Sequence, residues 1–154
     1  MNDAENGGTG RGGQTGPVPW LDAIPHARAL GLALRAFGEA RAVIALPYDP
    51  RLVGNPATGV LHGGAITTLL DTVCGMAAYA ALTRLRTMAT LDLRIDYMRP
   101  ATPGATVVGE AACTRVTRRI AFVRGLAHEG DGTDPVAAAT ATFMLGPDGE
   151  AGGP

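Results

Sequence analysis

The chain has 154 residues, and its 13 Lys and Arg residues nearly balance its 14 Asp and Glu residues, for a formal net charge of −1. This length suits a single domain with its own core. The charge balance lacks the basic surplus that nucleic-acid binding requires. The chain contains neither Lys nor Ser, which excludes a Schiff-base lysine, a P-loop lysine and a Ser-His-Asp triad. These exclusions favour a carboxylate as the reactive group.

The two ends differ in composition from the rest of the chain. Residues 1–17 are rich in Gly and polar residues without apolar periodicity, which predicts a disordered leader. They lack the pattern of a signal peptide, and the most apolar helix of the chain is too short to span a membrane. We therefore predict one domain at 18–146, a flexible tail at 147–154, and a cytoplasmic protein without membrane or nucleic-acid partners. Cys74 and Cys113 have no metal-type spacing, so we expect both to be reduced core residues.

Short elements are expected first along the chain. Apolar residues recur at helical spacing through 19–37 but are interrupted by Pro25 and Gly31, which predicts one or two short helices. Residues 40–46 read as a strand, and a loop with several Pro and Gly residues at 47–56 follows. His26 lies in the first segment and His128 near a later strand end; we assign neither of them a role.

The segment 65–82 predicts a buried helix, because nearly every side chain in it is apolar or small. Asp71 interrupts this pattern. A buried carboxylate needs a hydrogen-bonding partner or a cavity, so Asp71 is either a catalytic group or a structural carboxylate bonded to Thr or backbone groups. Gly63 and Gly64 leave the first amides of the helix uncovered, which suits a developing oxyanion as well as close packing of the helix start.

The spacing of these groups indicates an assembly. Asp71 follows Gly63 by eight residues, or about 12 Å along one helix, so one small carbonyl cannot touch both. Two copies of the helix packed antiparallel across a two-fold axis would bring Gly63 of one chain toward Asp71 of the other. We infer a shared active site.

The pattern after the helix changes to period two. Apolar residues at 91, 93, 95 and 97 alternate with charged residues at 92, 94 and 96, which predicts a half-buried strand. Three further strands are expected at 105–116, 119–128 and 136–145, joined by short turns that favour antiparallel meander pairing. An apolar helix followed by such strands predicts an α+β fold in which the sheet wraps around the helix.

These residues together resemble the hotdog-fold acyl-CoA thioesterases of the phenylacetic-acid-degradation (PaaI-like) group. The resemblance covers roughly 52–145 and rests on Asn55, the run 59–64, the pair at 70–71, the strand 90–100 and the strand 139–142. It implies an antiparallel sheet around one long central helix, dimers joined edge to edge, and often tetramers made of two such dimers. It also implies hydrolysis of acyl-CoA thioesters without metal or organic cofactor.

The resemblance also implies roles for particular residues. The Gly63 N–H would polarise the thioester carbonyl, with Gly64 beside it in the substrate site, and Asp71 of the partner subunit would act as nucleophile or as general base. Asn55 and His62 would orient substrate or water, although His62 could equally be structural and Asn55 could form only a turn.

Four further residues are less certain members of the site. Thr90 matches a position where some relatives have a hydroxyl near the lytic water, but strict alternation puts it on the face of Asp92, away from the helix. Arg99, Arg118 and Arg119 suit the phosphates of CoA, although Arg118 and Arg119 could also be a solvated turn.

Other functions stay open. The alternatives are a hotdog dehydratase or hydratase acting on acyl thioesters, a non-catalytic acyl-CoA-binding or sensing module, and an interaction scaffold. The acyl group is also open, because Met76, Tyr79, Met88 and Met98 could line a pocket or fill the core.

Overall fold

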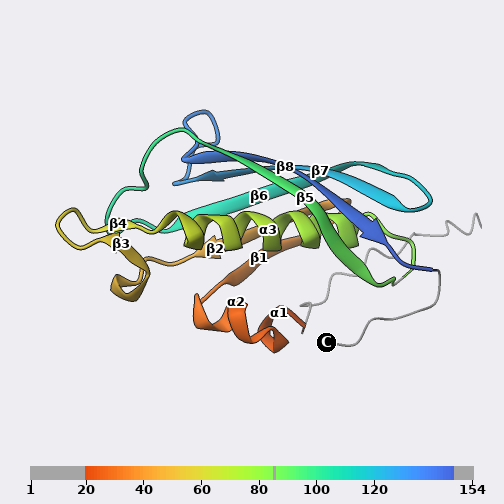
Figure 1. Cartoon of the computed structure of the whole chain (residues 1–154), viewed down its shortest axis with the longest axis horizontal. Coiled ribbons are helices and arrows are strands. Elements are labelled where there is room, and N and C mark those ends of the chain that lie inside the picture. Colours follow the sequence, from red (N-terminus) through yellow and green to blue (C-terminus); the bar gives the residue numbers. More distant parts are fainter. Residues whose placement is uncertain (1–19, 85, 148–154) are drawn as a thin grey trace, which may run out of the picture.

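A six-stranded antiparallel sheet wraps around one long helix, α3 (Figure 1). The structure is a computed structural model that describes residues 20–84 and 86–147. The strands lie in the order β1-β2-β6-β7-β8-β5, so β1 and β5 form the two edges of the sheet. The elements are α1 (Trp20–Ala23), α2 (Pro25–Ala29), β1 (Ala33–Gly38), β2 (Arg41–Leu46), the 3-10 helix η1 (Pro50–Leu52), β3 (Val53–Asn55), β4 (Val60–Leu61), α3 (Gly63–Ala80), β5 (Met88–Tyr97), β6 (Val107–Val116), β7 (Ile120–His128) and β8 (Ala137–Leu145).

Most predicted elements are confirmed. The predicted helix is α3, the strand expected at 40–46 is β2, and the last four predicted strands are β5 to β8. β6, β7 and β8 form the expected meander, whereas β5 pairs with β8 at the far edge. The predicted leader at 1–17 lies outside the described residues, as does all of the predicted tail except Pro147. In the described part of the chain, no helix combines the length and apolar character needed to cross a membrane.

The prediction for 19–37 is partly wrong, because only its first part is helical. α1 and α2 end by Ala29, and the rest of the segment enters β1. The pairing of β1 with β2 has a bulge between Leu34 and Ala36, so Leu34 and Phe37 face Ile44 and Ala42 on the side of α3. Because of the bulge, Leu34 and Phe37 are three positions apart and still face the same side of the strand. This spacing is also typical of one face of a helix.

α3 is buried against the sheet but has one open side. Its fully buried residues include Leu69, Leu70 and Val73, which belong to the core. Asp71 and Thr72 are only half-buried, as is Thr67 one turn earlier. The helix is therefore apolar toward the sheet and carries a polar stripe along its remaining side, and the candidate carboxylate lies in that stripe.

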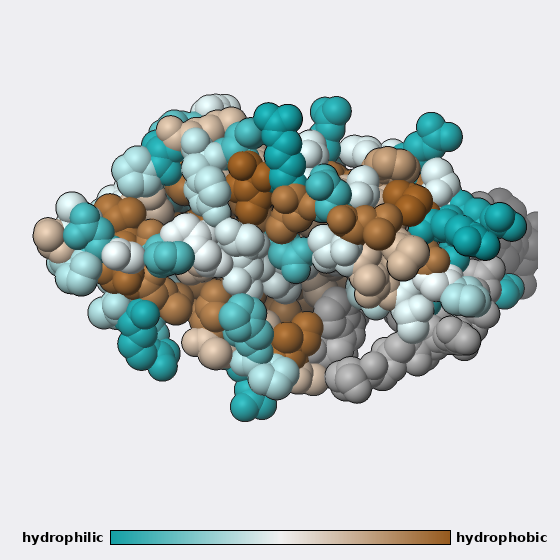
Figure 2. Space-filling model, viewed as in Figure 1, coloured by the Kyte–Doolittle hydropathy of each residue, from teal (hydrophilic) through white to brown (hydrophobic). Residues whose placement is uncertain are grey.

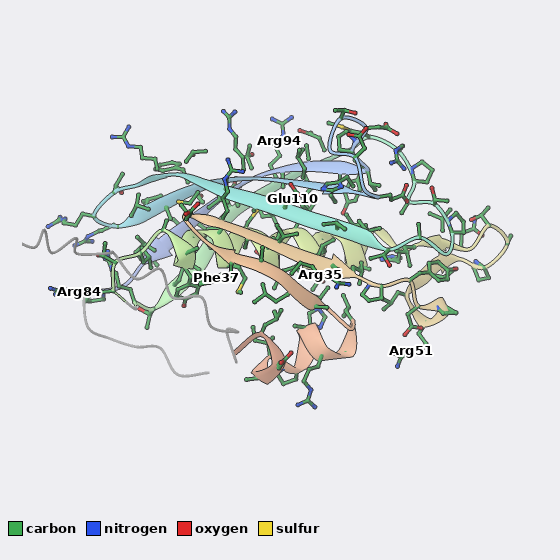
Figure 3. All side chains as sticks on the ribbon, turned by 180° about the vertical axis from the view of Figure 1, so that it is seen from behind. Arg35, Phe37, Arg51, Arg84, Arg94 and Glu110 are labelled. Atoms are coloured by element: carbon green, nitrogen blue, oxygen red, sulfur yellow. The ribbon has the colours of Figure 1, made fainter. Side chains whose placement is uncertain are left out.

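The edge strand β5 exposes large apolar groups. Leu91 and Tyr97 are about half exposed, as is Met98 directly after the strand, at 52%, 51% and 58%. Figure 2 shows hydrophobic side chains reaching the surface on the same side of the molecule from which Figure 1 is viewed. Arg94 of β5 and Glu110 of β6 lie on the face of the sheet that is turned away from α3 (Figure 3).

Candidate active site

The start of α3 is capped by an imidazole. His62 is the N-cap residue, with extended backbone angles (φ −64°, ψ 137°), and its Nδ1 accepts a 2.9 Å hydrogen bond from Gly64 N–H. Because Nδ1 accepts, we assign the ring proton to Nε2. Within residues 20–84 and 86–147, the N–H of Gly63 has no hydrogen-bond partner. The predicted donor Gly63 is therefore free at the positive end of α3, whereas the Gly64 N–H is occupied.

Tyr97 is a site residue that the sequence analysis did not select. Its hydroxyl donates to the Gly63 carbonyl at 3.0 Å and lies 2.7 Å from Oγ1 of Thr67. Thr67 Oγ1 also donates to the Gly63 carbonyl, at 3.1 Å. Tyr97 ends β5 on the face turned toward α3, opposite Ala137 of β8. The sequence feature that could have indicated this role is a tyrosine at the end of the apolar face of a strand, because its side chain is long enough for the hydroxyl to reach a neighbouring helix.

Asp71 and Thr90 lie together. Thr90 Oγ1 donates to Oδ1 of Asp71 at 3.0 Å. Strict alternation predicted Thr90 on the face of Asp92. That prediction is wrong, because β5 has a bulge between these two residues. Thr90 pairs with the buried Phe143, and the bulge at Leu91 absorbs one position of the alternation. The candidate carboxylate is thus held by a hydroxyl from the edge strand.

Neither cysteine competes with Asp71 as a nucleophile. Both are free, and Cys74 is fully buried. Burial, and secondarily the charge of Asp71, raises the pKa of the Cys74 thiol to about 12. Burial also raises the pKa of Cys113. Both thiols are therefore protonated at neutral pH, and a protonated thiol is a poor nucleophile.

Asn55 forms a turn in front of the site. Its Oδ1 accepts from Ala57 N–H at 3.0 Å, and its carbonyl accepts from the N–H groups of Thr58 and Gly59 at 3.1 and 2.9 Å. The side chain is exposed at the end of β3. Asn55 therefore forms the turn that the sequence offered as the alternative to a substrate contact. The side-chain NH₂ of Asn55 has no hydrogen-bond partner within the described residues.

Arg99 is engaged in an ion-pair network. Its Nη1 donates to Glu129 Oε2 at 2.9 Å, its Nη2 donates to the Asp134 carbonyl at 2.9 Å, and its Nε lies 3.0 Å from Asp134 Oδ2. Glu129 also accepts from the N–H and hydroxyl of Thr102. Burial alone would raise the pKa of Glu129, but these hydrogen bonds together hold it below its ordinary value. Arg99 would have to leave this network to bind a phosphate.

Arg118 and Arg119 lie in the turn between β6 and β7, and both are exposed. The Arg118 carbonyl accepts from Arg86 Nη2 at 2.8 Å, and Arg86 follows the C-terminal end of α3. The turn is therefore at the opposite end of α3 from Gly63, as the ribbon also shows (Figure 1). Within one chain these arginines are not brought to the glycine pair.

Two surface hollows of the described residues lie away from Gly63 and Asp71. One, of about 620 Å³, lies on the sheet face turned away from α3 and is lined in part by Arg115, Phe122 and Arg124. The other, of about 260 Å³, follows the end of α3. The single chain therefore presents the donor at Gly63 and the carboxylate at Asp71 on an open side of the helix.

Comparison with known proteins identifies the family. A family model described as the thioesterase superfamily matches residues 58–136, which contain α3 and the strands β5, β6 and β7 of the sheet. The chain belongs to the thioesterase superfamily. Its hotdog fold, expected from the resemblance, is confirmed by its similarity to solved structures that are named as members of that superfamily.

Relatives of this thioesterase-superfamily chain cover most of its length. The medium/long-chain acyl-CoA thioesterase YigI of Salmonella typhimurium is 36% identical over 136 residues, a match that covers 80% of this chain and 86% of YigI. A Pseudomonas aeruginosa protein of known structure is 46% identical with a TM-score of 0.74, over 81% of this chain and 93% of that one. A mutant of the phenylacetic acid degradation protein PaaI from Thermus thermophilus is 28% identical with a TM-score of 0.69, over 79% and 98% of the two chains.

Proposed function

We propose that this protein hydrolyses acyl-CoA thioesters to the free acid and CoA. The observation that carries the proposal is that the open side of one helix presents both a free amide donor, Gly63 N–H, and a hydroxyl-held carboxylate, Asp71. Oxyanion stabilisation and an oxygen nucleophile or base are the two requirements of thioester hydrolysis. The YigI relatives, which are named as medium/long-chain acyl-CoA thioesterases, support both the reaction and a medium- or long-chain acyl group.

The proposed reaction uses these groups in order. Gly63 N–H donates to the thioester oxygen, which becomes negative as the carbonyl carbon is attacked. Asp71 either attacks that carbon or takes a proton from the water that attacks it. The C–S bond then breaks, and CoA leaves as the thiolate. Where Asp71 has attacked, water hydrolyses the resulting acyl–Asp71 anhydride and regenerates the carboxylate. On either route, water supplies the hydroxyl of the acid and the proton that CoA takes up.

We propose that each site is shared by two protomers joined along β5. Within the described chain β5 pairs with β8 and leaves its other edge open. β5 supplies the residues that hydrogen-bond both groups, since Tyr97 donates to the Gly63 carbonyl and Thr90 donates to Asp71. An antiparallel pairing of two β5 strands centred on Arg94 brings Tyr97 of one protomer beside Thr90 of its partner, because the bulge at Leu91 absorbs one position of the register. This pairing unites Gly63 of one chain with Asp71 of the other.

We propose further that two such dimers form a tetramer. The sheet face turned away from α3 exposes Phe122 and Met144, at 39% and 49%, and supplies a second apolar surface for association. Arg94 and Glu110 on the same face (Figure 3) give it charges of both signs.

The test is thiol release from aryl-, phenylacetyl- and straight-chain acyl-CoAs by the native protein and three variants. Gly63→Pro removes the N–H without requiring a new backbone conformation, because proline suits the first helical position and His62 already has the extended angles that a residue before proline needs. Gly63→Ala is its matched control, since it keeps the N–H and its Cβ would lie 3.6 Å from the Tyr97 hydroxyl, an ordinary contact. Asp71→Asn keeps the shape of the carboxylate and removes its basicity.

We expect Gly63→Pro to lower kcat by about a hundredfold or more while Gly63→Ala stays within a few-fold of native. Asp71→Asn should lower kcat by roughly a thousandfold, or about 4 kcal/mol. Near-native turnover by Asp71→Asn would remove the carboxylate from the mechanism. Equal losses in Gly63→Pro and Gly63→Ala would remove the amide. Binding of the acyl-CoAs without hydrolysis by the native protein would favour an acyl-CoA-binding module instead.

A further inference from the structure

The Gly63 carbonyl is bonded from outside its own helix. Besides the Thr67 hydroxyl one turn along α3, it accepts from Tyr97 of β5, 34 positions away in the sequence. The Tyr97 hydroxyl also lies 2.7 Å from Thr67 Oγ1, so the two hydroxyls and the carbonyl form a closed triangle. The edge strand is therefore tied to the first turn of the helix at one peptide group.

The same peptide group also carries the N–H that is capped by the His62 side chain. The carbonyl of Gly63 and the N–H of Gly64 belong to one planar amide, and the N–H donates to His62 Nδ1 at 2.9 Å. A hydrogen bond accepted by an amide oxygen polarises the group and strengthens donation by its N–H. A continuous chain of hydrogen bonds thus runs from the Tyr97 hydroxyl through the amide to the imidazole.

We propose that Tyr97 is a positioning residue that fixes the orientation and tautomer of His62. With Nδ1 held as an acceptor, the neutral ring keeps its proton on Nε2. His62 then offers Nε2–H as a donor in addition to the free Gly63 N–H, and it serves in hydrolysis as a donor to substrate or water, with Asp71 left as the base. This inference rests on the proposed function for its catalytic part, whereas the link from Tyr97 to His62 is independent of substrate.

The test compares Tyr97→Phe with Tyr48→Phe in the full chain. Tyr48 is a matched control because its hydroxyl also donates to a glycine carbonyl, that of Gly59, at 2.9 Å. The ring nitrogens of His62 are observed by ¹⁵N NMR at neutral pH without substrate. The chain has 3 His residues, so the His62 signals are assigned from their loss in His62→Gln.

We expect the native protein and Tyr48→Phe to show an acceptor Nδ1 and a protonated Nε2 at His62, and Tyr97→Phe to show mixed tautomers. In acyl-CoA hydrolysis, Tyr97→Phe should lower kcat by about tenfold with KM changed less than about twofold, because the donor is misoriented and binding groups remain. A purely stabilising tie would lower thermal stability without moving the tautomer.

An unchanged His62 tautomer in folded Tyr97→Phe would overturn the proposal, and so would an unchanged kcat in an active enzyme. Thr67→Val is a second variant that keeps Tyr97, and we expect it to move the tautomer less. A shift in Thr67→Val with none in Tyr97→Phe would assign the tie to Thr67 and also overturn the proposal. Failure of the native protein to hydrolyse acyl-CoAs would contradict the proposed function and the catalytic role of His62, and the tautomer would still decide the link.

Discussion

At the scale of single residues, the candidate carboxylate depends on a partner from another element. Asp71 lies in the polar stripe of α3, and Thr90 of β5 donates to one of its oxygens at 3.0 Å. The other oxygen, Oδ2, has no partner within the described residues. A carboxylate held through one oxygen keeps the lone pairs of the other for a water or a carbonyl carbon.

Replacing Thr90 by Val should therefore lower kcat by about five- to tenfold, equal to ~1–1.4 kcal/mol, because one hydrogen bond that orients Asp71 is lost. The steady-state rate of thiol release measures this. Thr114→Val is the matched control, since Thr114 is also an exposed strand residue and its hydroxyl donates to the Phe122 carbonyl at 3.2 Å. Equal kcat values for the two variants would show that Thr90 does not orient the carboxylate.

At the scale of elements, the position of α3 against the sheet depends on glycines. An added Cβ at Gly125 of β7 would lie 2.9 Å from the Cys74 sulfur and 3.4 Å from the Glu110 carbonyl oxygen. Cys74 is fully buried and the strand backbone cannot move away without breaking its pairing with β6 and β8. The missing side chain at Gly125 thus sets how closely α3 approaches the sheet.

We expect Gly125→Ala to lower the free energy of unfolding by about 1–3 kcal/mol, because overpacking displaces the helix or the sulfur. Chemical denaturation measures this change. Gly132→Ala is the control, since its Cβ would meet only a Leu126 methyl at 4.0 Å. Adding Cys74→Ala to Gly125→Ala should restore part of the lost stability, and no restoration would mean that the sulfur is not the obstacle.

Bulges explain where the analysis of elements from sequence was wrong. A bulge near Arg35 made β1 look helical, and a bulge at Leu91 moved Thr90 to the face of α3. A third lies between Cys113 and Arg115 in β6. Each bulge shifts the alternation by one residue while leaving the composition of the strand unchanged, so a period of two cannot reveal it.

At the scale of the whole molecule, the proposed site joins two chains. Asp71 and Gly63 are tied to opposite halves of β5, which is an open edge with three exposed apolar residues at or beside it. Unpaired edges of this kind are ready to add a further strand. A monomer by light scattering with full activity would refute the shared site.

Hybrid dimers offer a sharper prediction. When chains carrying Asp71→Asn are refolded with an equal amount of chains carrying Gly63→Pro, half of the dimers contain one site with both native groups. The mixture should recover about one quarter of native activity, since each hybrid restores one of its two sites. Mixing Asp71→Asn chains with the double variant is the control, because it restores no site. Recovery no greater than this control would indicate that one chain supplies both groups.

The central helix, the glycine pair at its start, the carboxylate at Asp71 and the late strands of the sheet could all be predicted from the amino-acid sequence. These features depend on local periodicity, on the conformational freedom of glycine and on the cost of burying a charge, all of which can be read from neighbouring residues. Family membership follows from the same local motifs, which is why the resemblance and the comparisons agree.

Which side chains contact Gly63 and Asp71 could not be predicted from the sequence, because those contacts are made by distant elements. Tyr97 reaches Gly63 and Thr90 reaches Asp71, whereas Arg99 is held by Glu129 and Asp134. Each of these contacts joins residues at least 19 positions apart. Their partners are set by strand register and by bulges, and a shift of one residue turns a side chain to the opposite face of the sheet. Candidate groups for the site could therefore be proposed from the chain, but their supporting contacts depend on how the sheet closes around the helix.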